Sequence, residues 1–393
     1  MRERAVLVAI EFDRDQYPLR SRKDGPEGPR SAKLSWSMDD ELQELTELAR
    51  SAGCEVVEVV RAKRHDPVAA TLIGSGKIEE IGGQAKQVKA QVVIFNRELS
   101  PAQQRNIEDV VAIKTIDRTQ LILDIFAQRA KSQEGKVQVE LAQLRYLLPR
   151  LVGKGIALSR LGGGVGTRGP GETKLEVDRR RIRERITRVL HELEKLSSRR
   201  EATRRRRRDA RVFVAALVGY TNAGKTTLLN RLTGADSLAQ DRPFTTLDPL
   251  ARRMRLPSGN SIVVTDTVGF LHRLPHHLIE AFKATLEEAE DADVLIHVLD
   301  ASHPLALEQA EAVREVLGML DLREKPVLTA LNKIDQLPSE QAIHELKAQL
   351  PMPLPISART GAGLDELLRL LEDAVRASGK TSTDSGDGPP LST

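Results

Sequence analysis

The feature that most constrains the fold is the run Gly219-Tyr-Thr-Asn-Ala-Gly-Lys-Thr226, which has the spacing of a phosphate-binding loop. The apolar segment 212–218 before it predicts a buried strand, and the segment 227–232 after it predicts a helix. Glycine lets the backbone of such a loop turn around a β-phosphate, and we expect the Lys225 amine to reach the β- and γ-phosphates. The predicted contacts come from Gly219, Tyr220, Thr221, Asn222, Ala223, Gly224, Lys225, Thr226 and Thr227.

A second motif, Asn332-Lys-Ile-Asp335, predicts that the bound base is guanine. It follows another apolar strand pattern at 326–331 and lies about 110 residues after the phosphate loop, as a doubly wound sheet requires. The Asp335 carboxylate can accept from both N1–H and N2–H of guanine, whereas adenine would leave it facing a lone pair. Asn332 would join this loop to the phosphate loop. The rest of the predicted base pocket is Lys333, Ser357 and Ala358.

Two segments between these motifs are predicted to sense the γ-phosphate. In Phe244-Thr-Thr-Leu-Asp-Pro249, Thr246 is the hydroxyl expected to close on Mg²⁺, with Thr245 as the alternative. Asp266 would hold the same ion through water, and the Gly269 N–H would meet the γ-phosphate. The predicted metal ligands are therefore Thr226 and Thr246, and the predicted catalytic residues are Lys225, Thr246 and Gly269.

Composition constrains the cellular compartment in which such a GTP-binding chain is expected. Its 393 residues contain a single cysteine, Cys54, so an intrachain disulfide is impossible. No apolar run approaches the roughly 18 residues that span a bilayer, and the first residues lack an apolar signal core. We predict a cytoplasmic monomer, with a peripheral association at the membrane left open.

The pattern along the chain predicts four parts of an α/β protein. Residues 1–117 alternate strands and helices, as in a small α/β domain with a mostly parallel sheet. Residues 118–210 predict an antiparallel helical hairpin, with one helix over 119–150, another over 175–209, and a glycine-rich basic tip at about 151–174. Residues 211–376 form the doubly wound P-loop GTPase domain. Residues 377–393 are predicted to be disordered.

Positive charge is concentrated in the hairpin. Between residues 151 and 211 there are 19 Lys and Arg against 8 Asp and Glu, which suggests a polyanionic partner. With aromatic residues at 3%, stacking on single strands is not expected, so backbone charge and shape would be read instead. The alternatives are a solvated helix end for the arginine run and a plain linker for the tip. The candidate RNA-binding residues are Arg160, Arg168, Lys174, Arg204, Arg205, Arg206, Arg207 and Arg208.

The loop Gly162-Gly-Gly-Val-Gly-Thr-Arg-Gly-Pro-Gly-Glu-Thr173, the basic helix after it and the GTPase motifs together resemble the HflX-type GTPases. The resemblance implies binding to the large ribosomal subunit, with the hairpin tip reaching ribosomal RNA near the peptidyl transferase centre. It also implies splitting of stalled or idle ribosomes. The alternative is a GTP-gated assembly or hibernation factor that splits nothing. Some members of the family are credited with ATP use by the N-terminal domain, for which this sequence offers no phosphate loop.

Overall fold

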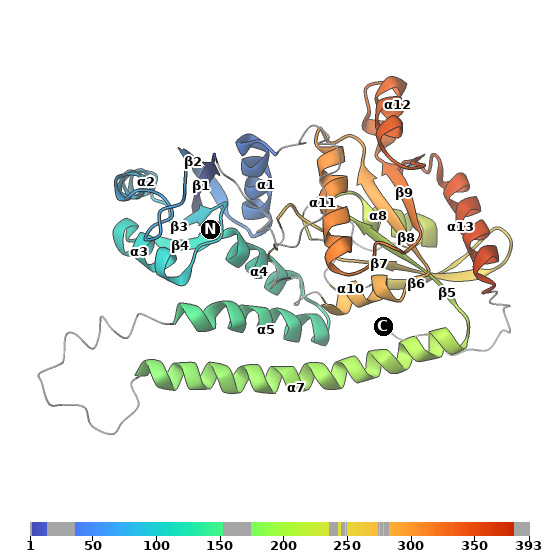
Figure 1. Cartoon of the computed structure of the whole chain (residues 1–393), viewed down its shortest axis with the longest axis horizontal. Helices are drawn as coiled ribbons and strands as arrows, with labels where there is room; N and C mark the ends of the chain where they lie inside the picture. Colours follow the sequence, from blue (N-terminus) through green and yellow to red (C-terminus); the bar gives the residue numbers. More distant parts are fainter. Residues whose placement is uncertain are drawn as a thin grey trace, which may run out of the picture. The chain divides into compact units, whose positions relative to one another are not determined.

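The structure is a computed structural model that describes residues 2–13, 36–151, 174–235, 243–244, 248, 250–273, 275, 278 and 283–380. It comprises two compact units (Figure 1): Met1–Glu194 with Pro275–Ala281, and Lys195–Leu274 with Phe282–Thr393. The division falls within helix α7 (Lys174–Asp209), whereas the sequence suggested a boundary at 210/211. No helix in the described ranges is long and apolar enough to cross a membrane.

The N-terminal sheet of the first unit is parallel throughout and has the strand order β2-β1-β3-β4. Its strands are β1 (Arg4–Phe12), β2 (Glu55–Arg64), β3 (Val92–Phe95) and β4 (Lys114–Asp117). Apolar residues on both faces of β1 and β3 are buried, as expected for a parallel sheet covered on both sides. Helices α2 (Ser75–Gln87) and α3 (Pro101–Val111) pack on one face, and α1 (Met38–Ser51) and α4 (Arg118–Arg129) lie against the other.

Local sequence signals explain where these helices begin. The Ser37 and Ser100 hydroxyls accept from the backbone N–H three residues later, and in both cases the residue at that position bonds back to the cap. Pro101 occupies the first helical position after Ser100, where its missing N–H costs nothing. These caps account for the starts of α1 at Met38 and of α3 at Pro101.

The single helix predicted over 119–150 is in fact two, α4 and α5 (Gln133–Arg150). The break comes at Ala130–Ser132, because the Ser132 side chain accepts from the Gly135 N–H and starts a new helix there. Helix α5 runs antiparallel to α7, since Gln133 bonds Glu192 at 2.7 Å while Arg185 binds Glu140. The predicted tip that would join them, including Arg160 and Arg168, lies in 152–173, outside the described residues.

A buried polar cluster holds α5 on the end of β4. The Tyr146 hydroxyl donates to Asp117 Oδ1 at 2.8 Å, and Arg150 Nη2 lies 3.3 Å from Asp117 Oδ2. The Arg150 guanidinium also stacks over the Tyr146 ring at 3.4 Å. Burial, with the neighbouring Asp117 charge, raises the pKa of Tyr146, so the hydroxyl remains a donor.

The second unit contains the predicted doubly wound sheet, in the order β10-β9-β8-β5-β7-β6. Strand β6 (Leu250–Arg255) is antiparallel to β7 (Ser261–Asp266), and the other neighbours are parallel: β5 (Phe213–Gly219), β8 (Val294–Asp300), β9 (Val327–Asn332) and β10 (Leu354–Pro355).

Helices cover both faces of this sheet, which confirms the predicted α/β class. Helices α8 (Lys225–Thr233) and α13 (Leu364–Ser378) share one apolar core with the sheet. On the other face, α10 (Lys283–Glu290) contacts β5, and α11 (Ala306–Met319) packs on β8 and β9. Helix α12 (Glu340–Gln349) precedes β10. Beyond α13, the predicted tail from 381 onward lies outside the described part of the chain.

Candidate nucleotide-binding site

The phosphate loop joins the carboxyl end of β5 to the start of α8, as the sequence predicted. Its glycines are needed for close approach. A Cβ on Gly219 would lie 2.2 Å from the Val298 carbonyl oxygen, and one on Gly224 would lie 2.3 Å from Asn332 Nδ2. Gly224 also has φ +94, a conformation that side chains disfavour. The loop can therefore close around a ligand only with glycine at both positions.

Asn332 ties three loops together at the carboxyl edge of the sheet. Its Nδ2 donates to the Ala223 carbonyl at 2.8 Å, and its Oδ1 accepts from the Ala358 N–H at 2.9 Å. Asn332 is itself buried, so these bonds are shielded from water. The phosphate loop, the base-reading loop and the 357–358 loop are thus held in one arrangement.

Asp335 is presented as an ionised hydrogen-bond acceptor. Its Oδ1 accepts from the Ser357 hydroxyl at 2.5 Å, and its Oδ2 lies 2.6 Å from Arg359 Nη2. The Ser357 hydrogen bond, with a smaller contribution from Arg359, lowers the pKa of Asp335. Two features here were not anticipated: Arg359, which directly follows Ser357-Ala358, and the 2.6 Å ion pair of Lys333 with Asp300 that braces the loop. For Arg359, its place beside the motif is the signal that could have revealed it.

The groups predicted to meet phosphate and metal lie together behind the loop. Lys225 Nζ donates to the carbonyls of Gly219 and Tyr220 at 3.0 and 2.8 Å. Burial lowers the pKa of Lys225 to about 8, against an opposing effect of Asp266. The Thr226 hydroxyl donates to Asp266 Oδ2 at 2.7 Å, so a hydroxyl and a carboxylate oxygen converge there. Oxygen donors of this kind suit Mg²⁺.

Gly269 lies directly against the phosphate loop. A Cβ on it would come within 2.8 Å of Thr221 Cα and 3.2 Å of Lys225 Nζ. The next residue, Phe270, donates its N–H to the Gly219 carbonyl at 3.1 Å and accepts from the Thr221 N–H at 2.8 Å. The Phe270 ring is only 1% exposed and carries no polar group that could orient water.

The structure therefore brings together nearly all of the predicted nucleotide site. From the first sensing segment, Phe244 is buried with φ +57, while Thr245 and Thr246 lie outside the described residues. Asn222 adopts a left-handed conformation within the phosphate loop, with φ +62. An unanticipated contact is the Tyr220 hydroxyl, which accepts from the His272 N–H at 2.7 Å and links the phosphate loop to the segment after Gly269.

The arginine run at the end of α7 is not a uniform basic surface. The Arg204 side chain is 10% exposed, with Nη2 3.1 Å from Glu287 and Nε 2.9 Å from Asp291. Arg207 donates to both carboxylate oxygens of Glu288 at 3.1 Å. Arg204 and Arg207 therefore have counter-charges within the chain, and their assignment as RNA ligands stays a prediction.

The remaining arginines of the run differ from those two. Arg208 pairs with Glu201. Arg205 and Arg206 are exposed and form no ion pair with any residue that the structure describes. Helix α7 begins at Lys174, whose side chain is outside the described set. Of the proposed RNA ligands in the run, Arg205 and Arg206 are thus the ones presented to solvent with their charge uncompensated.

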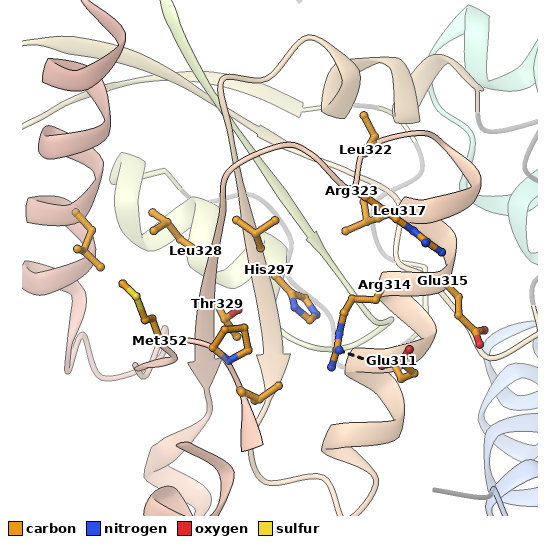
Figure 2. Close-up of a pocket in the computed structure, with 14 residues that line it drawn as sticks. His297, Glu311, Arg314, Glu315, Leu317, Leu322, Arg323, Leu328, Thr329 and Met352 are labelled. Carbon is orange, nitrogen blue, oxygen red and sulfur yellow. Dashed lines mark ion pairs between the residues drawn. The ribbon is translucent and has the colours of Figure 1, made fainter. Parts of the chain in front are cut away.

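A cavity of about 610 Å³ beside β8, β9 and α11 is separate from this site (Figure 2). None of the predicted nucleotide-binding residues lines it. One of the two buried polar residues that line it is His297, whose pKa is lowered to about 4 by burial, with Arg314 and Lys225 adding to the effect. The imidazole is therefore neutral at physiological pH, and its Nε2 has no hydrogen-bond partner among the described residues.

Three family models match the chain in succession. They are described as "GTP-binding GTPase N-terminal" over residues 39–127, "GTP-binding GTPase Middle Region" over 129–207 and "50S ribosome-binding GTPase" over 214–333. The GTPase HflX of Caldanaerobacter subterraneus subsp. tengcongensis is 48% identical over 372 residues, which cover 94% of this chain and 80% of that protein. The GTPase HflX of Escherichia coli K12 is 44% identical over 389 residues, covering 99% and 86%. With this identity over nearly the whole chain, and with the guanine-nucleotide motifs assembled at one edge of its sheet, the protein belongs to the HflX family of GTPases.

Proposed function

We propose that this GTPase uses its nucleotide cycle to control binding to the large ribosomal subunit, and that it thereby splits stalled or idle ribosomes. The observation that carries this is a charge distribution: Arg205 and Arg206 stand exposed on the helix that leads directly into a GTPase domain matched as 50S ribosome-binding. RNA phosphates are the natural counter-charge for such a pair. We further propose that the protein acts in the cytoplasm as a monomer.

In the nucleotide cycle, Asp335 reads the two guanine donors while Ser357 and Ala358 close the base pocket. Lys225 leaves its two carbonyl partners and binds the β- and γ-phosphates, where its charge opposes the charge that develops in the transition state. The Gly269 N–H donates a hydrogen bond to the γ-phosphate, so loss of that phosphate releases the segment after Gly269.

Mg²⁺ fits the oxygen donors at this site. Thr226 and Thr246 would hold the ion directly and Asp266 would hold it through water. When bound, the ion neutralises charge on the β- and γ-phosphates. Replacing Thr226 with alanine removes one oxygen ligand of Mg²⁺ and leaves the Asp266 carboxylate in place. The substitution therefore tests the assignment of Thr226 as a ligand while part of the metal site remains.

Contact with ribosomal RNA would come from the helix and from the hairpin tip. Arg205 and Arg206 offer phosphate contacts on α7, and Arg160, Arg168 and Lys174 would offer them at or beside the tip. The basic residues carry affinity through charge, whereas a glycine-rich tip allows close approach to an RNA surface.

Sedimentation with purified subunits and whole ribosomes, in GTP, GDP and a non-hydrolysable analogue, tests the binding. Light scattering in the same conditions then tests splitting. We expect pelleting with large subunits in the triphosphate state and a fall in scattering with whole ribosomes. Replacing residues 162–171 by a short Gly/Ser linker should preserve GTP affinity and abolish the scattering change. Binding without any fall in scattering would favour an assembly or hibernation factor that splits nothing.

The arginine assignment is tested by salt dependence. The double substitution Arg205→Gln and Arg206→Gln should weaken subunit binding and reduce the slope of log affinity against log salt by about 2, one for each lost phosphate contact. The matched control is the double substitution Arg253→Gln and Arg255→Gln. Both arginines are exposed on β6, and replacing them removes the same amount of charge. Equal losses in the two double variants would mean that only net charge matters.

A further inference from the structure

Three arginines of α7 and three acidic residues near α10 form a compact ion-paired cluster, which we call the α7–α10 clamp. Arg200 Nη2 lies 3.1 Å from Glu287, Arg204 reaches Glu287, Glu288 and Asp291, and Arg207 forms a two-pronged contact with Glu288. The arginines are spaced by four and then three residues, so one face of the helix presents all of them. Opposite them, Glu287 and Glu288 lie on α10 and Asp291 directly follows it.

The clamp is built like an internal contact rather than a solvated surface pairing. The exposed fractions of the Arg204, Arg207 and Glu288 side chains are 10%, 14% and 6%. Partly buried pairs are screened little by salt, and a forked arginine–carboxylate contact fixes orientation as well as distance. Removing one partner would leave a charge buried without its counter-charge, which is strongly unfavourable. The two helices should therefore move together.

The clamp also occupies a special place along the chain. Among the described residues, α10 is the first full helix after Asp266 and Gly269, the residues expected at the γ-phosphate. Helix α7 leads within a few residues into β5 and the phosphate loop, and in the other direction it continues without a break to Lys174. A packed, continuous helix is the kind of rigid element through which a local change can be transmitted.

We propose that the α7–α10 clamp couples the nucleotide state of the GTPase domain to α7. When the γ-phosphate is gained or lost, the segment after Gly269 rearranges and carries α10 with it, and the clamp passes the displacement to the basic helix. The coupling is reciprocal, so anything that holds α7 must also shift the relative affinity for GTP and GDP. This deepens the proposed function, because it assigns Arg200, Arg204 and Arg207 to signalling and leaves Arg205 and Arg206 for RNA.

Hydrogen exchange of the full-length protein tests the clamp without ribosomes. Exchange of the α7 amides over 195–209 is measured in GDP and in a non-hydrolysable GTP analogue, with site saturation verified in each. We expect wild-type rates in this segment to differ by about tenfold between the two states. In Arg207→Gln, or in Glu288→Gln, the difference should fall below about twofold. The combined swap Arg207→Glu with Glu288→Arg should restore it.

Arg206→Gln is the matched control, since it removes the same charge one residue away on the exposed face, and it should keep the wild-type difference. Glu287→Gln provides a second break if either variant at the forked contact melts early. Identical α7 exchange in both nucleotide states of the wild type would overturn the proposal, as would a retained difference in the single variants. A failure of ribosome binding alone would leave these exchange results standing, so the two proposals can be separated.

Discussion

Replacing Asp335 by asparagine should convert a guanine site into one that prefers xanthine. In the structure the carboxylate Oδ1 already accepts from Ser357, a bond that an amide oxygen can keep. The amide nitrogen would then take the place of Oδ2, beside Arg359 and facing a guanine donor. Hydrogen bonds to a charged group contribute about 1.5–3 kcal/mol each, so losing the charged partner of two guanine donors should cost about 4 kcal/mol. That corresponds to about a 10³-fold loss in GTP affinity.

The measurement is competition of unlabelled nucleotides against a fluorescent guanine nucleotide, for wild type and Asp335→Asn. Xanthosine triphosphate should gain affinity in the variant, because its O2 accepts from the new amide where guanine carries an amine. Asp365→Asn, the same substitution on the exposed first turn of α13, should behave as wild type. Equal competition by ATP and GTP in the wild type, or unchanged GTP preference in Asp335→Asn, would refute the assignment of base reading to this carboxylate.

Three further outcomes are expected. Bound phosphates should raise the pKa of Lys225 from about 8, so GDP binding should take up a proton. The affinity for GDP should then fall as pH rises past 8, by up to about tenfold per pH unit. Calorimetry in buffers of different ionisation enthalpy measures the proton uptake, and a constant affinity from pH 7 to 9.5 would contradict this prediction. The folded-state pKa of His297, about 4, lies below its usual 6.5, so its neutral burial should cost about 2 kcal/mol of stability between pH 6.5 and 5. The free energy of opening of β8, measured by hydrogen exchange, should therefore fall from pH 6.5 to pH 5 in the wild type and change less in His297→Phe. The same fall in the variant would contradict this prediction. Single-turnover GTP hydrolysis should be slow for the free protein, because Phe270 cannot orient water, and should rise by about 10²-fold or more with large subunits; equal rates would mean that the chain carries a complete catalytic set.

The GTPase domain could be predicted from the sequence because its motifs combine local conformation with chemistry. Gly219 and Gly224 mark backbone positions that no side chain can occupy, and Asn332 was placed correctly as the tie to the phosphate loop. The strand before the phosphate loop followed from the apolar run at 212–218. These signals lie within a few residues of what they determine, which is why they could be interpreted without a structure.

What the sequence did not reveal depends on partners far along the chain. The break before Ser132 is set by one serine hydroxyl, in a stretch whose helical pattern otherwise continues. Arg359 reaches Asp335 only because the loop after β10 folds back to β9. His297 carried a weak signal, as a lone histidine in an apolar strand, but a satisfied core histidine gives the same pattern and only the fold distinguishes the two.

The arginine run shows why a count of charges cannot assign a partner. Five successive arginines on a helix point in five directions about 100° apart, so they cannot all meet one surface. Acidic residues on α10 and directly after it pair with Arg204 and Arg207, which lie three residues apart, and Arg205 and Arg206 between them are left without such a partner among the described residues. Glu287 and Asp291 are four residues apart, as Arg200 and Arg204 are, and Glu288 and Asp291 are three apart, as Arg204 and Arg207 are. Intervals of three and four keep side chains on one side of a helix. The run therefore has two different faces. Arg204 and Arg207 pair with acidic residues of the same unit, whereas Arg205 and Arg206 face solvent, where the proposed contact with RNA would form.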